Sequence, residues 1–199
     1  MIIKILSWNV NSIRARLEQV LNVCKKYKPD IICLQETKVV NESFPKNEFL
    51  KLGYSHFYLH GIPSYNGVAI ITQQEAESYD ILNLSQLNNG RQIGIKIFGI
   101  QIHNFYVPSG GDVPDEKTNL KFKNKLDFLN ALINWSKKIR PKNCLICGDF
   151  NIAPLEDDVW SHKQLKNIVS HTDIERKNLL KFLQVGDWHD AVRAQINPP

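Results

Sequence analysis

Several apolar stretches of this sequence end in a polar residue that is able to do chemistry. An amide, a carboxylate and a phenol close three of them at Asn9, Glu36 and Tyr106, and Asp149 and Asn151 close a fourth. The ends of neighbouring strands form a platform for a site, and a carboxylate at the close of a buried strand is otherwise costly to bury. Each residue could instead cap its own strand or the loop that follows. The pattern favours a site and leaves the second interpretation open.

The elements that would position these residues alternate between short apolar runs and longer amphipathic stretches, which is typical of an α/β protein. Turn residues at Asn88–Gly90 and Phe98–Gly99 separate some of the runs. Four predicted strands between Ser55 and Tyr106 follow one another without a helix, so we expect antiparallel pairs. The predicted strands are Ile2–Asn9, Asp30–Glu36, Ser55–Tyr58, Val68–Thr72, Arg91–Phe98, Ile100–Tyr106 and Cys144–Asp149.

Apolar residues that recur every three or four positions predict the helices. Pro29 and Pro141 are expected to end the first two, and Thr172 with Glu175 forms a capping box that opens the third. The predicted helices are Arg14–Tyr27, Asn119–Lys138 and Thr172–Leu183.

The composition is that of a globular chain with one core. Its 199 residues are 43% hydrophobic and 23% charged, so we expect one domain over residues 1–199. A net charge of +5 is compatible with a polyanionic partner but is also common without one. The N-terminus shows neither a basic leader nor a cleavage site, and no stretch is long enough to span a bilayer, so we expect no membrane partner.

The four cysteines lie in apolar periodic segments, at Cys24, Cys33, Cys144 and Cys147. A disulfide framework would place them in loops, so we expect a reducing cytoplasmic location. Cys144 and Cys147 have the spacing of a zinc or redox pair. Because positions three apart in a strand face opposite sides, we interpret both as packing residues.

Five blocks of the sequence then resemble, in order and spacing, the successive motifs of the endonuclease/exonuclease/phosphatase superfamily. Within it, Gln35–Lys38, Arg14 and Asp187–Arg193 are most similar to exonuclease III and its abasic-endonuclease relatives. The five blocks are Ser7–Arg14, Leu34–Lys38, Tyr65–Ala69, Asn104–Pro108 and Gly148–Pro154.

This resemblance implies a four-layered α/β sandwich, in which two mixed β-sheets pack face to face and helices flank them. It also implies a DNA-repair phosphodiesterase that cuts 5′ to abasic sites and removes nucleotides from duplex 3′ ends by Mg²⁺-dependent hydrolysis. Double-stranded DNA would be the partner, with no obligate protein partner. Mn²⁺ is an expected substitute for Mg²⁺.

The resemblance further implies roles for the residues at the strand ends. Glu36, with Asn9 beside it, would hold the metal ion. Asp149 would orient or deprotonate the attacking water, Asn151 would donate to a phosphate oxygen, and Tyr106 would hydrogen-bond the phosphate or the leaving oxygen.

Three further positions resemble the DNA-backbone contacts of the family, namely Arg14, Tyr65 and Arg91. A solvated arginine or a packed tyrosine is the alternative interpretation of each. Local departures from the family pattern also occur, because Asn11–Ser12 stands where many relatives have an acidic or amide residue followed by glycine.

The closing segments of the family have no counterpart in this sequence. None of its six histidines lies in an Asp-His pair before an apolar strand. We therefore expect a domain that is incomplete at its C-terminus, lacks the last strands and has severely reduced activity or none. Exposed apolar surface and an unpaired sheet edge would favour self-association.

Three alternatives remain beside the repair nuclease. The chain could be a catalytically impaired fragment that binds nucleic acid, which salt-dependent DNA binding without cleavage would indicate. It could be another phosphodiesterase or phosphatase of the superfamily, such as a sphingomyelinase, an inositol-phosphate phosphatase or a secreted deoxyribonuclease. It could also be a plain α/β domain whose polar strand ends are caps.

Overall fold

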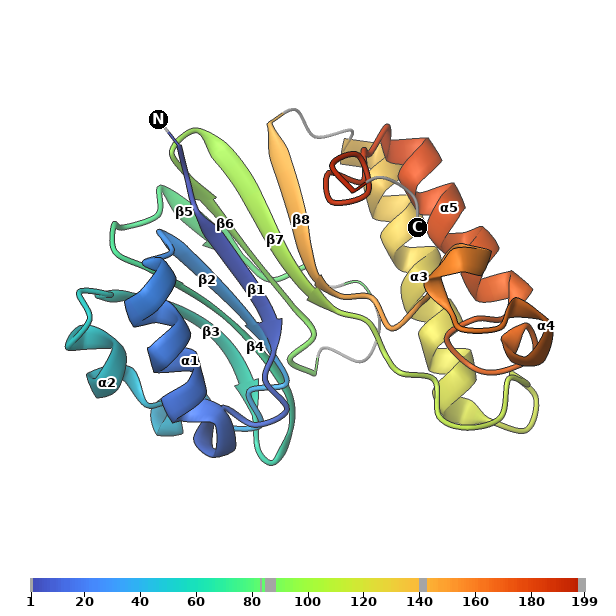
Figure 1. Ribbon diagram of the computed structural model, residues 1–199, viewed down its shortest axis with the longest axis horizontal. Helices are drawn as coiled ribbons and strands as arrows, with labels where there is room; N and C mark the ends of the chain where they lie inside the picture. Colours follow the sequence, from blue (N-terminus) through green and yellow to red (C-terminus); the bar gives the residue numbers. More distant parts are fainter. Residues whose placement is uncertain (1, 83, 85–88, 140–142, 197–199) are drawn as a thin grey trace. The chain divides into compact units, whose positions relative to one another are not determined.

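The computed structural model describes residues 2–82, 84, 89–139 and 143–196 (Figure 1). The chain forms two compact units. The first comprises Met1–Tyr106 with Asn143–Phe150, and the second comprises Val107–Lys142 with Asn151–Pro199. All strands of the described residues belong to the first unit.

One mixed sheet of the first unit has the strand order β1-β2-β4-β3. Its strands are β1 (Ile5–Asn9), β2 (Ile31–Gln35), β4 (Tyr65–Thr72) and β3 (His56–Ile62). β1 and β2 run parallel, whereas β4 is antiparallel to β2 and to β3. Since β1 and β2 are parallel, their carboxyl ends reach the same edge of the sheet.

The second mixed sheet has the strand order β5-β6-β7-β8. Its strands are β5 (Ser78–Asp80), β6 (Gln92–Ile97), β7 (Ile100–Tyr106) and β8 (Cys144–Asp149). Only β7 and β8 are parallel, and their register pairs the final residue of one strand with the final residue of the other. The carboxyl ends of β7 and β8 therefore also lie side by side.

The two sheets pack face to face through a shared apolar core. β2 and β4 of the first sheet contact β7 of the second, and β4 also contacts β6. Side chains alternate between the faces of a strand, so every second residue points into this core. Its buried residues are Ile31, Cys33, Val68, Ile70, Ile93, Ile95, Ile97, Ile102 and Tyr106.

Helices α1 (Ile13–Tyr27) and α2 (Lys46–Leu50) cover the other face of the first sheet (Figure 1). The intervening residues of β2 and β4 pack against them, which explains why every residue of β2 is buried and why its sequence shows no polar alternation. The main buried members of this second core are Ile13, Val20, Cys24, Ile32, Leu34, Phe49, Ala69 and Ile71.

Helix α1 has a sequence-encoded start and stop. The Ser12 side chain accepts a hydrogen bond from the backbone nitrogen of Ala15. The helix ends at Lys28, which takes a left-handed conformation and donates its N–H to the carbonyl of Cys24. These two caps fix the chain that connects β1 to β2.

The second unit contains α3 (Leu120–Ile139), α4 (His162–Leu165) and α5 (Asp173–Gly186). Helices α3 and α5 lie side by side (Figure 1). Trp188, just after α5, donates its Nε1–H to Ser136 Oγ of α3 at 2.7 Å. This bond and the stacking of Trp188 on Trp135 fix the end of α5 against α3.

The predicted α/β class is confirmed, with two mixed sheets and flanking helices. Strands β7 and β8 have the predicted bounds, and the capping box opens α5. Helix α1 begins one residue earlier than predicted, and α3 begins and ends one residue later. The first strand begins at Ile5 instead of Ile2, and β3 and α5 extend beyond their predicted ends. The predicted single domain stays a prediction. The expected roles of Asn88 in a turn and of Pro141 as a helix end lie outside the described residues.

Some short elements were not predicted: α2, α4, β5 and the two 3-10 turns, Asn41–Ser43 and Glu156–Asp158. Each spans at most five residues, too few for an apolar period to show. Cys147 packs against the core between the sheets, so its interpretation as a packing residue is confirmed, whereas that of Cys144 stays a prediction. In the described part of the chain, no helix has the length and apolarity needed to cross a membrane.

Candidate active site at the strand ends

The amide of Asn9 joins two carboxylates that lie far apart in the sequence. Its Nδ2 donates to Glu36 Oε1 at 2.8 Å and to Asp149 Oδ2 at 2.7 Å. A carboxamide nitrogen has two hydrogens, so one N–H serves each carboxylate. The predicted convergence of these strand ends is therefore observed for Asn9, Glu36 and Asp149, all in the first unit.

Backbone hydrogen bonds hold the loops that carry Asn9 and Glu36. Val10 donates its N–H to Gln35 at 3.0 Å, Ser12 donates to Glu36 at 2.7 Å and Ile13 donates to Thr37 at 3.1 Å. Glu36 itself has a φ of 54°, a left-handed conformation that a glutamate rarely adopts. The paired loops overcome this local cost and turn the Glu36 side chain out of the line of the strand.

Glycine makes the approach of β8 to β7 possible immediately before Asp149. Gly148 has a φ of 132°, and a Cβ atom at this position would lie 1.9 Å from the carbonyl oxygen of Phe105. Any larger residue would push the strands apart. The Gly-Asp pair in the sequence is thus a requirement of backbone spacing as well as of chemistry.

Glu36 is held ionised by its neighbours although it is largely buried. Burial opposes its charge, but hydrogen bonds from Asn9, Lys38 and Tyr106 outweigh that effect and place the pKa of Glu36 below its ordinary value. Lys38 Nζ lies 3.0 Å from Glu36 Oε2 and also donates to Asn11 Oδ1. The Glu36 side chain keeps 18% of its surface exposed, so a small ion can reach it.

Tyr106 contributes a protonated phenol to the same cluster. Burial, followed by the nearby charge of Glu36, raises the pKa of Tyr106 well above its ordinary value, so the hydroxyl remains a donor at neutral pH. The guanidinium of Arg91 lies over the Tyr106 ring, 4.8 Å from its centre, and Arg91 also donates to the Tyr106 carbonyl. Arg91, itself only 7% exposed, therefore packs on the Tyr106 ring and restrains it.

The three predicted DNA contacts have different surroundings. Arg91 is hydrogen-bonded to Tyr65, and its Nε has no hydrogen-bond partner among the described residues. Tyr65 is 56% exposed at the start of β4, and Arg14 is exposed in the first turn of α1. The roles of all three on DNA stay predictions.

Asn151 belongs to the second unit, and its predicted proximity to the other site residues stays a prediction. It follows Asp149 by two residues in the chain and has a φ of 51°. Its Nδ2 donates to the carbonyl of Val107 at 3.0 Å, and its own carbonyl accepts from Lys125 Nζ at 2.7 Å. Two residues of its own unit thus restrain Asn151.

Two residues of the cluster were not predicted as site residues, Lys38 and Asn11. Both lie two positions after a predicted residue, Lys38 after Glu36 and Asn11 after Asn9. The signal was present in the Gln35–Lys38 block, where a lysine follows a carboxylate that closes a strand. The polar residues that lie two positions after each strand end are therefore candidates for the same site.

The cluster suits a hard divalent ion. Mg²⁺ is often bound in proteins by one or two carboxylates, with water and substrate oxygens as its other ligands. Glu36 is such a carboxylate, is ionised and already accommodates a cationic group on Oε2. Asn9 presents its nitrogen to both carboxylates while its Oδ1 accepts from the N–H of Asn11 at 3.0 Å, so it orients Glu36. Within the described ranges, no group of three or more His, Cys, Asp or Glu side chains could hold a metal without other ligands.

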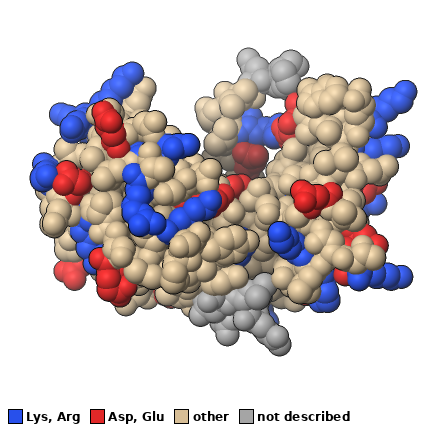
Figure 2. Space-filling view, turned by 90° about the horizontal axis from the view of Figure 1, so that it is seen from below, with Lys and Arg blue, Asp and Glu red and all other residues tan. Residues whose placement is uncertain are grey.

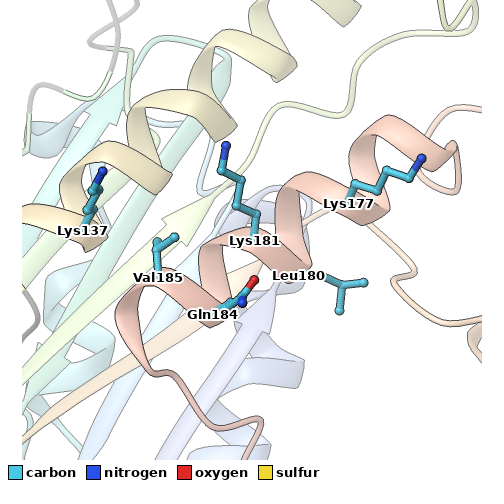
Figure 3. A pocket seen from close by; sticks show the side chains of 6 residues that line it. All are labelled: Lys137, Lys177, Leu180, Lys181, Gln184 and Val185. Carbon is cyan, nitrogen blue, oxygen red and sulfur yellow. The ribbon is translucent and has the colours of Figure 1, made fainter.

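A different kind of pocket lies between α3 and α5 in the second unit (Figure 3). It has a volume of about 640 Å³ and contains three lysines but no carboxylate. It therefore offers no negatively charged ligand for a cation, and its three lysines disfavour one. Its lining residues are Lys137, Lys177, Leu180, Lys181, Gln184 and Val185.

Charges of both signs are interspersed on the face of the molecule that Figure 2 shows. The net charge of +5 is not gathered there into one continuous basic surface.

The sequence matches the family model described as "Endonuclease/Exonuclease/phosphatase family" over residues 6–191. Exodeoxyribonuclease III of Haemophilus influenzae is 34% identical over 167 residues, which cover 78% of this chain and 60% of the relative. The chain thus spans less than two thirds of the length of that relative.

Solved structures of similar proteins agree with these matches. An AP endonuclease from Archaeoglobus fulgidus has a TM-score of 0.84 and 38% identity, covering 92% of this chain and 71% of that chain. A 3′ phosphatase from Neisseria, solved with a product DNA hairpin, has a TM-score of 0.83 and 28% identity with the same coverage. The likeness to these two proteins extends over both units of the fold.

Proposed function

Because this chain belongs to the endonuclease/exonuclease/phosphatase family, we propose that it is a DNA-repair phosphodiesterase of the exonuclease III type. The proposed reactions are Mg²⁺-dependent hydrolysis of the backbone 5′ to abasic sites and removal of nucleotides from duplex 3′ ends. The observation that carries the proposal is the pair of carboxylates, Glu36 and Asp149, joined by the amide of Asn9. The similar exodeoxyribonuclease, AP endonuclease and DNA-bound 3′ phosphatase support DNA as the substrate.

Glu36, with Asn9 beside it, would hold the Mg²⁺, with Mn²⁺ as a substitute. The bound ion would supply positive charge to the phosphate oxygens on which negative charge develops. Asn9 fixes the orientation of the carboxylate through its Nδ2. Hydrogen bonds from Asn9 and Lys38 outweigh burial and lower the pKa of Glu36. Tyr106 adds a phenolic donor to the same side chain.

Asp149 would orient the attacking water and accept its proton. The bond from Asn9 holds one oxygen of Asp149, and the close pairing of β7 with β8 holds its backbone. Tyr106 keeps its proton at neutral pH and would donate to the phosphate or to the leaving oxygen. Asn151 would donate its side-chain N–H to a non-bridging phosphate oxygen.

Three residues would hold the DNA backbone, namely Arg14, Tyr65 and Arg91. The exposure of Arg14 and Tyr65 makes them accessible to a large ligand. Arg91 has a buried Nε without a hydrogen-bond partner in the described part of the chain, and a phosphate oxygen could satisfy it. Binding that depends on such contacts weakens as salt increases.

The test is incision of a duplex that contains a single abasic site, with Mg²⁺ and with a chelator. We expect metal-dependent cutting that Glu36→Ala abolishes. Glu18→Ala is the matched control, because Glu18 is an exposed glutamate on α1. Circular dichroism of each variant separates loss of chemistry from loss of fold.

Other outcomes would favour the alternatives. Salt-dependent binding of the same duplex without cutting would indicate a catalytically impaired nucleic-acid-binding protein. Hydrolysis of a sphingomyelin or inositol-phosphate substrate, with DNA left intact, would place the activity elsewhere in the family. Cutting that survives Glu36→Ala would overturn the assignment of the metal to Glu36.

A further inference from the structure

A fully buried ion pair lies in the second unit, between α3 and α5. Lys125 Nζ is 2.5 Å from Glu175 Oε1, and neither side chain has any exposed surface. Removing two charges from water costs several kcal/mol per ion, and apolar residues of similar volume often stabilise a core equally well. A role in stability alone therefore gives no reason for charge at these two positions.

The Lys125 ammonium contacts three separate loop segments in addition to Glu175. It donates to the carbonyl of Ser109 at 3.1 Å, to the carbonyl of Asn151 at 2.7 Å and to Ser170 Oγ at 3.4 Å. An apolar side chain could fill the same space but could make none of these bonds. The shortest of the three contacts is the one to Asn151.

Glu175 keeps the ammonium in place because its own carboxylate cannot move. The backbone N–H of Ser170 donates to both of its oxygens at 3.0 Å, and Thr172 donates to Oε2 through its N–H and its hydroxyl. The Thr172 donors belong to the capping box that begins α5, and Ser170 lies two residues before it. The start of α5 thus fixes Glu175, and Glu175 fixes Lys125.

We propose that Lys125 is a positioning residue that sets the conformation of Asn151 for phosphate binding, with Glu175 as its anchor. The inference rests on the proposed function of Asn151. Asn151 has a left-handed φ of 51°, and it is held by Lys125 at its carbonyl and by the Val107 carbonyl at its side chain. The Lys125 contact restrains the backbone of Asn151, and the Val107 contact restrains its side-chain amide.

The variant that tests this is Lys125→Met with Glu175→Gln. It replaces the ion pair by neutral side chains of similar size, and the glutamine can still accept from the start of α5. We expect kcat on an abasic duplex to fall by roughly 10- to 100-fold, as a displaced positioning group typically causes. KM should change by less than about threefold, because the substrate surface is otherwise intact. The control is Lys123→Met with Asp127→Asn, an exposed pair on the same helix that should leave kcat unchanged.

A double-mutant cycle with Asn151→Ala distinguishes positioning from general loosening of the fold. If Lys125 acts through Asn151, the Lys125/Glu175 substitution should lower kcat by less than about twofold in the Asn151→Ala background. Effects that multiply instead would overturn the proposal. So would an unchanged kcat in the Lys125→Met/Glu175→Gln protein.

A second readout does not depend on nuclease activity. In ¹⁵N-labelled protein, the side-chain amide resonance of Asn151 should shift or broaden in the Lys125→Met/Glu175→Gln variant and stay unchanged in the control pair. A wild-type protein that does not cut DNA would disprove the proposed function, and this resonance would still report the positioning of Asn151. An unchanged resonance would disprove the positioning.

Discussion

Glu36 in the first unit and Glu175 in the second are both carboxylates that lie beside a lysine, yet their surroundings differ. Glu36 keeps 18% of its side-chain surface exposed and is bound by side chains, those of Asn9, Lys38 and Tyr106. Glu175 is completely buried and is bound by backbone N–H groups as well as by Lys125. The partner lysines differ in the same way, since Lys38 is 29% exposed and Lys125 is fully buried.

The difference separates a carboxylate that can exchange partners from one that cannot. A partly exposed lysine can leave Glu36 for solvent at little cost, which allows another cation to take its place. Backbone donors of a helix start cannot leave Glu175 unless α5 unfolds. An acidic side chain at a strand end is thus a candidate for chemistry when other side chains, more than backbone groups, satisfy it.

Replacement of Asp149, the carboxylate that would orient the attacking water, should have the largest effect on kcat. Asp149→Asn keeps an oxygen that can accept from Asn9 but removes the base, so we expect kcat on an abasic duplex to fall by roughly 10²- to 10⁴-fold. Steady-state kinetics with Mg²⁺ measures this. Asp157→Asn, at an exposed aspartate, is the control. An Asp149→Asn protein with wild-type activity would exclude Asp149 as the base.

Breaking the buried pair should have the next largest effect, on stability. Lys125→Met leaves the charge of Glu175 buried without its cation, so we expect the free energy of unfolding to fall by about 3–5 kcal/mol. Adding Glu175→Gln should restore most of the loss, because no charge is then left alone. Urea denaturation followed by circular dichroism measures both. If Lys125→Met were as stable as Lys125→Met/Glu175→Gln, Glu175 would tolerate the loss of its cation, and it would not be a carboxylate with fixed partners.

Much of the fold could be predicted because its longer elements carry a clear pattern. The run Ile100–Tyr106 and the segment Cys144–Asp149 have strand lengths and turn residues at their ends, and the structure gives both the same bounds. The first strand was predicted too long, because Ile2 and Ile3 are apolar but have no pairing partner in the sheet. Apolar character alone does not decide where a ladder of hydrogen bonds begins.

The candidate site could be predicted in part, because some of its residues end predicted strands. Asn9, Glu36 and Asp149 stand at strand ends, and parallel pairing brings such ends together. Lys38 and Asn11 were not recognised as partners, since their contacts depend on left-handed turns after the strands. The pair of Lys125 and Glu175 was not predicted, because a charged residue in an amphipathic helix is normally assigned to its exposed face.

The pKa of Glu36 gives a smaller effect, which should appear as a pH dependence of stability. A carboxyl whose pKa is lowered in the folded state contributes stability above its unfolded pKa and loses it as the pH falls through the folded pKa. With a chelator present, the difference in unfolding free energy between wild type and Glu36→Gln should therefore shrink on acidification from pH 7. Denaturation at a series of pH values measures it. A difference that grows on acidification would contradict the lowered pKa.

The smallest effect on stability is expected from Lys38→Met, which removes the lysine beside Glu36 just as Lys125→Met removes the lysine beside Glu175. Lys38→Met removes an ion pair whose lysine is 29% exposed, and such pairs contribute under about 1 kcal/mol to the free energy of unfolding. Glu36 would still be satisfied by Asn9 and Tyr106, and water can reach the oxygen that Lys38 leaves. Urea denaturation measures the free energy of unfolding of Lys38→Met and of Lys125→Met, so the same substitution is compared at both positions. Equal losses in the two proteins would mean that Lys38 is as firmly bound as Lys125, and that Glu36 is not free to exchange its cation.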